Sequence, residues 1–277
     1  MKMKKNYSII AIAILLISFT PAATNAQEND STAEASFNFS GTVDTYFRTS
    51  FSEDPVAPAT SFADLNGFAL GMANFIVSYE GEKSGFVADV VFGPRGSDAV
   101  FGSQGNSSEL VNQLYAYYNL ADGVTVTMGN FNTFLGYEVI SPTANFNYST
   151  SYLFSYGPFS HTGIKADIAL GEDTSLMLAV MNPTDATEFN PNGSYAFGAQ
   201  LGFYGQYLNV LVDPAFFEID YTGGFDVSNS FFLGINAAYS NSDDADYSYQ
   251  GIALYLQNTF SDTFSLGFRP EFFTTTS

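Results

Sequence analysis

Apolar and polar residues alternate along most of the chain with a period of two, which is the spacing of an extended strand and not of a helix. Between 162 and 170, for example, Ile164 and Ile168 share one face, whereas Lys165 and Asp167 share the other. Thirteen such runs can be counted, and most approach the ~9–11 residues with which a tilted strand crosses a bilayer. Their approximate spans are 37–50, 67–80, 84–93, 109–119, 123–132, 162–170, 174–182, 195–204, 206–213, 216–225, 230–241, 248–258 and 262–273.

The connections between these runs alternate between long and short. Long links lie at 51–66, 94–108, 133–161 and 183–194, and short turns at 81–83, 120–122 and 171–173. Barrels of bacterial outer membranes have tight turns on the periplasmic side and long loops outside. The pattern predicts one all-β domain over 37–277, a transmembrane up-and-down antiparallel β-barrel. A soluble β-sandwich or a lipocalin-like barrel is the alternative.

Charged residues within the runs fall in the polar phase. They are the acids Asp44, Asp167, Glu218, Asp220 and Glu271 and the bases Arg48, Lys165 and Arg269. A Lys or Arg that faced lipid near the midplane would cost about 2–4 kcal/mol, which explains the segregation. Aromatic residues at strand ends are expected to form girdles at the membrane surfaces; these are Tyr79, Phe92, Tyr207, Tyr239 and Tyr255.

The composition narrows the classes of protein. Only 13% of the residues are charged, whereas there are 29 Phe and 18 Tyr, which is unusual for a surface covered entirely by water. The formal net charge of −20 argues against a nucleic-acid partner, because such binding needs a basic face. The absence of Cys excludes disulfides, thiolate metal sites and cysteine catalysis.

The N-terminus reads as an export signal. Lys2, Lys4 and Lys5 precede an apolar run at 9–19, and Thr24 and Ala26 are small residues suited to cleavage before residue 27. This predicts a signal peptide at 1–26, followed by a short polar lead-in at 27–36. An uncleaved membrane anchor is the alternative.

Several segments resemble the OmpL-like, porin-2 type family of outer-membrane β-barrel porins. The matching pieces are 41–48 (GTVDTYFR), 85–89 (GFVAD), 92–95 (FGPR), 128–138 (MGNFNTFLGYE), 145–149 (NFNYS), 151–152 (SY) and 157–163 (GPFSHTG). The resemblance implies a pore-forming barrel in the outer membrane of a Gram-negative bacterium. It also implies contact with outer-membrane lipid and insertion by the barrel-assembly machinery.

The end of the chain departs from that family, whose members usually finish with a closing strand that ends in an aromatic residue. This chain ends in 274–277 (TTTS). Because bacterial single-chain barrels have even strand numbers, thirteen runs favour a C-terminally truncated sequence with fourteen or more strands when complete. A miscounted strand between 206 and 225 is the alternative.

A barrel of this strand number holds water, so we expect passive diffusion of small hydrophilic solutes. The residues expected to line the lumen and set its selectivity are Asp44, Arg48, Asp89, Arg95, Lys165, Asp167, Glu218, Asp220, Arg269 and Glu271. Their acidic excess predicts a preference for cations. For loop acids such as Asp243, Asp244 and Asp246, keeping the loops soluble or binding divalent cations is an equal alternative.

Residues 139–160 carry no charge and interleave aromatic residues with Asn and Ser. The segment is expected to fold into the barrel and narrow it through Phe146, Tyr148, Tyr152, Phe154, Tyr156 and Phe159. The alternatives are an extracellular cap, or stacking of these rings on a sugar during uptake. A barrel plugged by this segment, with a surface-binding or structural role, is the second functional hypothesis.

An enzyme is not expected. Ser160 and His161 invite a hydrolase reading, but neighbouring residues of a strand point to opposite faces and cannot easily pair; a His at the barrel rim is the simpler interpretation. With a single His and no Cys, no metal site or cofactor is expected either. The sequence leaves the oligomeric state open, with a homo-oligomer among the alternatives.

Overall fold

The structure is a computed structural model that describes residues 35–51, 66–103, 105, 108–242 and 248–275. The expected signal peptide at 1–26, most of the lead-in at 27–36, and the loop acids Asp243, Asp244 and Asp246 lie outside the described residues. The account below concerns the unit that begins at residue 33.

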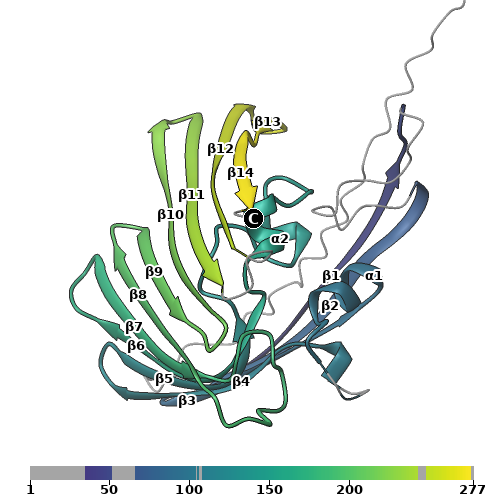
Figure 1. Cartoon of the computed structure of the whole chain (residues 1–277). Coiled ribbons are helices and arrows are strands. Elements are labelled where there is room, and N and C mark those ends of the chain that lie inside the picture. Colours follow the sequence, from purple (N-terminus) through teal and green to yellow (C-terminus); the bar gives the residue numbers. More distant parts are fainter. Residues whose placement is uncertain (1–34, 52–65, 104, 106–107, 243–247, 276–277) are drawn as a thin grey trace, which may run out of the picture. The chain divides into compact units, whose positions relative to one another are not determined.

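In the described part of the chain, fourteen strands form one antiparallel sheet (Figure 1). They are β1 (Ser36–Arg48), β2 (Gly67–Glu80), β3 (Ser84–Phe92), β4 (Val111–Ala121), β5 (Val124–Asn132), β6 (Ser160–Ala169), β7 (Thr174–Met181), β8 (Ala196–Phe203), β9 (Gln206–Val212), β10 (Phe216–Ser228), β11 (Phe231–Ser242), β12 (Tyr249–Ser261), β13 (Phe264–Phe268) and β14 (Glu271–Thr275). From β1 to β13 each strand pairs with its neighbours in the chain. The predicted up-and-down order is therefore confirmed.

The last expected run, 262–273, is divided into β13 and β14. Both pieces pair with β12, because Phe268 lies opposite Leu256 and Glu271 lies opposite Ala253. Pro270 stands between them and has no backbone N–H to give to the ladder, although its carbonyl accepts the N–H of Leu254 at 3.0 Å. The two strands thus continue one row of the sheet, which keeps thirteen rows in the described part.

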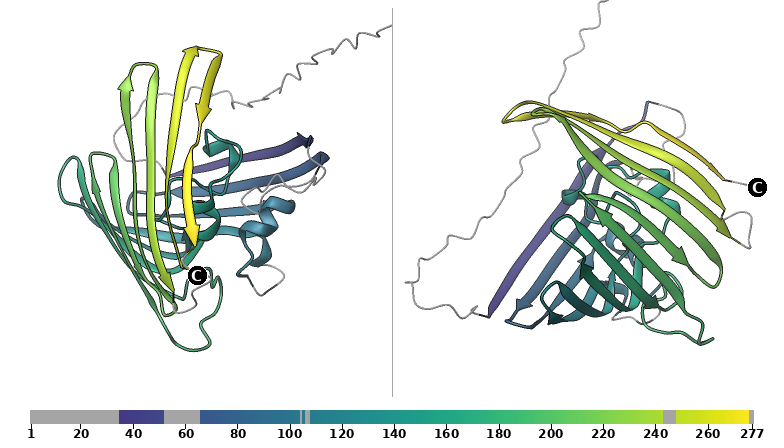
Figure 2. Two further views of the ribbon diagram at one scale, coloured as in Figure 1. Left: turned by 45° about the horizontal axis from the view of Figure 1, so that its top comes forward. Right: turned by 90° about the vertical axis from the view of Figure 1, so that its left-hand side faces the viewer.

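The sheet curls but is not closed. Within the described residues β1 pairs with β2 alone, and β13 and β14 pair with β12 alone. Figure 2 shows the curl, with the short helices inside it. The surface inside the curl is called the inner face below, and the opposite surface the outer face.

The two faces differ in polarity as the alternation predicts. The outer face presents large apolar side chains without cover; Phe39 is 75% exposed and Val43 is 76% exposed. Many other strands contribute to the same face, including Phe68, Phe75, Leu114, Met128, Ile164, Leu178, Phe197, Leu208, Phe217, Ile252 and Phe272. The inner face carries Asn74, Asp89, Asn209, Asp220 and Asn236, which are buried. A sheet of this kind suits a surrounding of acyl chains and a polar interior.

The strand boundaries also confirm the alternation of connections. On one side, the strands are joined by turns at 81–83, 122–123, 170–173, 204–205, 229–230 and 262–263. On the other side, consecutive strand ends are separated by 49–66, 93–110, 133–159, 182–195, 213–215 and 243–248, of which 52–65, 104, 106–107 and 243–247 lie outside the described residues. The turn between β8 and β9 has positive φ at Tyr204 (50°) and Gly205 (73°), which matches the twist of a two-residue hairpin.

Aromatic residues gather on the outer face beside the short turns. Phe37 and Tyr79 have ring centroids 4.9 Å apart, and Phe86 stacks on Tyr79 at 5.9 Å.

The girdle prediction is wrong for two residues. Tyr207 and Tyr255 occupy inner positions of β9 and β12. They share the phase of Asn209 and Ala253, and the register of the strands places that phase on the inner face.

Short helices occupy two of the long connections. They are α1 (Pro94–Ala99), η1 (Ser108–Leu110), η2 (Pro142–Ala144) and α2 (Tyr152–Tyr156). The sequence pattern did not predict them. Between α1, 140–159 and the inner face lies a hydrophobic cluster of Met72, Val91, Ala99, Val100, Ile140, Phe154 and Phe159. Among the described helices, none has the length and apolar character needed to cross a membrane.

Candidate functional site

Residues 133–159, called the inner segment here, connect β5 to β6 and lie against the inner face. The N–H of Thr133 donates to the carbonyl of Phe159 at 3.0 Å and closes the base of the segment. From there the chain crosses towards β8, where Nε2 of Gln200 donates to the carbonyl of Phe134 at 3.1 Å. A closed base and a packed interior are features of a compact surface loop, here turned onto the sheet.

Asp220 of β10 fastens the segment further on. Its carboxylate accepts hydrogen bonds from Nδ2 of Asn209 (2.7 Å), from Nδ2 of Asn236 and from the backbone N–H of Gly136 (3.0 Å). A buried carboxylate needs such donors to offset the loss of water. Gly136 has a φ of 81°, which a residue with a side chain rarely adopts, so its N–H can turn towards the carboxylate.

Glu138 and Arg269 form the second attachment. Nη1 of Arg269 lies 2.8 Å from Oε1 of Glu138, and Nη2 donates to Oγ of Ser149 at 3.0 Å and to the carbonyl of Thr150 at 2.8 Å. Oε2 of Glu138 accepts the N–H and the hydroxyl of Ser151 at 2.7 and 2.6 Å. Both side chains are mostly buried, so their opposite charges neutralise each other inside the protein.

Helix α2 is held by Glu271 of β14. The two carboxylate oxygens accept the backbone N–H groups of Tyr152 and Leu153, each at 2.9 Å. The Ser151 hydroxyl accepts the N–H of Phe154 at 3.0 Å, which is a typical N-cap bond. A carboxylate at this end of the helix also meets its positive partial charge.

Arg95 and Asp44 hold the part of the segment that faces β1. Nε of Arg95 donates to the carbonyl of Ile140 at 2.9 Å and Nη1 to that of Tyr148 at 3.4 Å. Arg95 is 1% exposed, and this burial lowers its pKa from the ordinary value. The hydroxyl of Tyr148 donates to Oδ2 of Asp44 at 2.7 Å. Burial first, and then the bond to Asp44, raises the pKa of Tyr148.

A comparison with models of known protein families identifies the family of this chain. The family model described as "Putative beta-barrel porin-2, OmpL-like" matches residues 36–277. This chain belongs to that porin family. The protein is therefore a β-barrel protein of the outer membrane with the role of a porin.

A solved structure agrees with the fold of this porin. The crystal structure of the outer membrane channel DcaP of Acinetobacter baumannii superposes with a TM-score of 0.54. The two chains are 14% identical over 88% of this chain and 80% of that one, a likeness that shows the fold alone. None of the curated proteins matches the chain in sequence.

The ten residues expected to line the lumen of the porin all lie inside the sheet or on α1, but in different settings. Asp89 is buried and accepts Nδ2 of Asn74 at 2.9 Å and of Asn112 at 2.6 Å. Glu218 is buried beside Asp220. Those that bind the inner segment are Asp44, Arg95, Asp220, Arg269 and Glu271. Lys165 and Asp167 form an ion pair of 2.8 Å with side chains 24% and 44% exposed, and Arg48 donates to Asn66 at 2.8 Å.

The six aromatic residues expected in a constriction also divide. Phe154 and Phe159 are buried in the hydrophobic cluster. Tyr152 and Tyr156 pack on Phe273 of β14, with ring centroids 5.4 and 4.7 Å away. Only Phe146 and Tyr148 combine substantial exposure with a position at the middle of the segment.

His161, which the sequence predicts at the barrel rim, is a buried residue of the porin. It is the second residue of β6, is fully buried, and its Nε2 lies 3.0 Å from Oγ1 of Thr133. Its ring packs near Phe131 and Phe134, at 6.3 and 5.2 Å between centroids. Ser160 occupies the other phase of the strand, so the two side chains do not form a catalytic pair.

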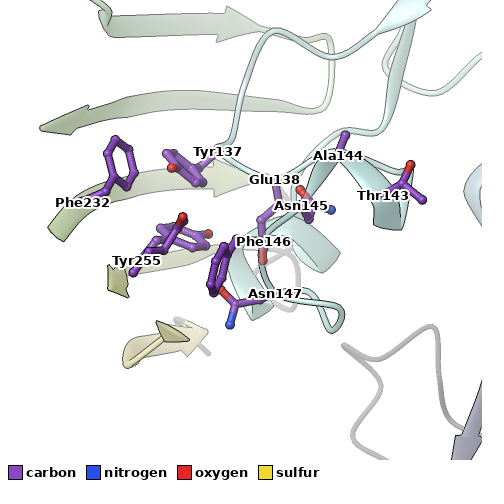
Figure 3. Close-up of a pocket in the computed structure, with 10 residues that line it drawn as sticks. Tyr137, Glu138, Thr143, Ala144, Asn145, Phe146, Asn147, Phe232 and Tyr255 are labelled. Carbon is purple, nitrogen blue, oxygen red and sulfur yellow. The ribbon is translucent and has the colours of Figure 1, made fainter. Parts of the chain in front are cut away.

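Sequence reasoning missed the cavities that border the inner segment. One of about 530 Å³ lies between the segment and the inner face of β11 and β12 (Figure 3). Tyr137 and Tyr255 stack there with ring centroids 4.1 Å apart and an interplanar angle of 21°. The period of two places Tyr255 in the phase of Tyr249 and Gln257, which was the available signal. Its place near a strand end instead predicts a girdle residue, and the structure contradicts that prediction.

Proposed function

We propose that this porin lets small hydrophilic solutes diffuse passively along its inner face, that the inner segment narrows the passage, and that cations are preferred. The observation that carries the proposal is the separation of the two faces. Large apolar side chains are exposed on the outer face, while the acids and bases of the strands and the buried amides of Asn74, Asn209 and Asn236 lie inside. A passage for water and solutes is the use that such a face has in an outer-membrane barrel.

The balance of charge supports the cation preference. Two of the bases, Arg95 and Arg269, use their donors on the inner segment, and Arg269 is paired with Glu138. The remaining inner acids exceed the remaining inner bases, and the whole chain has 28 acidic residues against 8 basic ones. A passage lined by such an excess concentrates cations and repels anions.

Planar-bilayer recordings test the proposal directly. The full-length protein, purified in detergent and shown to be folded, is inserted under a gradient of KCl. We expect stepwise openings and a reversal potential displaced towards that of K⁺. Asp167→Asn should reduce the displacement and Lys165→Met should increase it, because the two side chains pair with each other and carry opposite charge.

Two outcomes would contradict the proposal. A reversal potential displaced towards that of Cl⁻ would refute the cation preference. Folded protein that inserts but gives no openings would refute the passage, and it would favour the plugged barrel with a structural or surface-binding role.

A further inference from the structure

We propose that the inner face carries a binding track for uncharged saccharides, centred on the cavity between the inner segment and strands β11 and β12. The proposal rests on the passage proposed above and names the class of solute that it would favour. It is carried by the arrangement of aromatic rings, amides and balanced charges around three neighbouring cavities.

The central cavity is lined by aromatic rings and amide groups; among the rings Phe146 is exposed, whereas Tyr255 is buried against Tyr137. Its aromatic lining comes from Tyr137 and Phe146 of the inner segment and from Phe232 and Tyr255 of the strands. Figure 3 shows these four rings gathered together, with Thr143 and Ala144 away from them. Asn145, Asn147 and Gln257 add amide side chains to the same lining. A volume of about 530 Å³ is in the range of small-molecule sites.

Two further cavities continue this lining around the sheet. A cavity of about 440 Å³ shares Tyr137 and Phe232 with the central one and adds Gln200, Tyr207 and Thr222. A third, also of about 440 Å³, shares Phe134 with the second and is lined by the inner residues of β4 and β5. The shared residues make the three cavities neighbours, so the track runs from β4 to β12.

This lining fits the chemistry of a sugar. A pyranose ring has an apolar C–H face that packs on the electron-rich face of an aromatic ring. Its hydroxyl groups both donate and accept hydrogen bonds, which Asn and Gln side chains can match in both directions. Repeated rings along a track suit a chain of repeated sugar units.

The charges around the track favour a neutral ligand. Glu138 borders the central cavity, but its charge is balanced by Arg269 at 2.8 Å. In the lining of the third cavity the charge of Lys165 is balanced by Asp167 at 2.8 Å, and Glu80 is the other charged residue there. A charged solute would gain little from these balanced groups, whereas a neutral polyol loses less on leaving water.

Block of the ion current by a sugar tests the track. Maltohexaose is added to open channels in a planar bilayer, and a poly(ethylene glycol) of the same hydrodynamic size serves as the comparison. We expect a saturable reduction of current by maltohexaose with half-block at about 1–10 mM, and an unsaturable one by the polymer. Titration calorimetry of maltohexaose into the detergent-solubilised protein gives a second readout that does not require conduction.

Variants locate the binding. Phe146→Ala and Phe232→Ala should each weaken half-block about tenfold, whereas Phe146→Tyr should keep it near the wild-type value. Tyr156→Ala is the matched control, because Tyr156 lies on the same segment but packs on Phe273, away from the track.

Openings without saturable block and without calorimetric binding would overturn the inference and leave the passage intact. Equal weakening by Tyr156→Ala would also overturn it, whereas calorimetric binding without openings would refute only the passage.

Discussion

Asp185 shows how a single residue can connect the long loop 182–195 of this porin to the end of its inner segment. The residue lies in the loop 182–195, and its Oδ1 accepts the N–H groups of Phe159 and Ser160 at 2.9 and 2.8 Å. Burial raises the pKa of Asp185 to about 6, despite the opposing effect of those two bonds. Since the pKa in the folded state exceeds the ordinary value of 3.8, the folded protein holds this proton more tightly than the unfolded chain. The resulting stabilisation is complete below about pH 4 and is lost as the pH rises through about 6.

The variant Asp185→Asn should remove this titration. Asn tolerates the φ of 59° found here, so the change adds no backbone strain. The free energy of unfolding of the wild type, relative to the variant, should fall by up to about 3 kcal/mol between pH 4 and pH 7. Urea unfolding in detergent micelles, followed by circular dichroism at several pH values, measures this difference. Asp173→Asn, at an exposed turn residue, is the control, and a constant difference between wild type and Asp185→Asn would contradict the expectation.

Among the elements, the inner segment connects strands that the sheet itself leaves apart. Tyr148 binds Asp44 on β1, and Tyr152 and Leu153 bind Glu271 on β14. The carbonyls of Ile140 and Tyr148 both accept from Arg95, which brings the two ends of the stretch 141–147 close together. That stretch can therefore be shortened while these attachments stay, although the two hydrogen bonds between Asn145 and the backbone of Val139 are lost with it.

Replacing 141–147 by three glycines should widen the passage while the attachments of the segment remain. We expect the single-channel conductance to rise about twofold or more, because less of the cross-section is filled. Planar-bilayer recordings of the variant and the wild type at the same salt concentration measure the change. Shortening the loop 182–195 by residues 189–193 is the comparison and should leave the conductance near its original value. An unchanged conductance in the 141–147 variant would show that the segment does not narrow the passage.

For the molecule as a whole, the sheet separates two surroundings. Adjacent residues of β4 illustrate the difference, since Leu114 is exposed on the outer face and Gln113 lies on the inner face, where it accepts the N–H of Asn132 at 3.3 Å. The backbones of both residues are paired within the sheet. The two faces therefore differ only in their side chains, which are apolar towards lipid and polar towards the interior.

A charge should be tolerated on one face and not on the other. Leu114→Lys should destabilise the inserted protein by about 2–4 kcal/mol if this position lies near the midplane, and by less nearer the surface. Gln113→Lys, one residue away, should cost no more than the hydrogen bond that it removes, about 1 kcal/mol. Folding into lipid vesicles, read from the heat-dependent shift in gel mobility across a urea series, compares the two. Equal losses for both variants would contradict the assignment of the faces.

The sequence by itself determined the rows of the sheet, their order and their two faces. It could do so because a strand alternates its side chains with a period of two, and because a charge that faces lipid is costly. The positions of Asp44, Lys165 and Glu271 on the inner face follow from that local rule. The break at Pro270 was also visible as a residue without an N–H, although the pattern was read as one run.

Only the tertiary structure decided what the inner side chains meet. Arg95 and Glu271 hold the inner segment, His161 is buried, and Tyr255 stacks on Tyr137, although the alternation of the strands is equally compatible with open water at each of these positions. The physical reason is that a loop has no fixed period. Its place depends on hydrogen bonds and packing between residues far apart in the chain, which no local pattern contains.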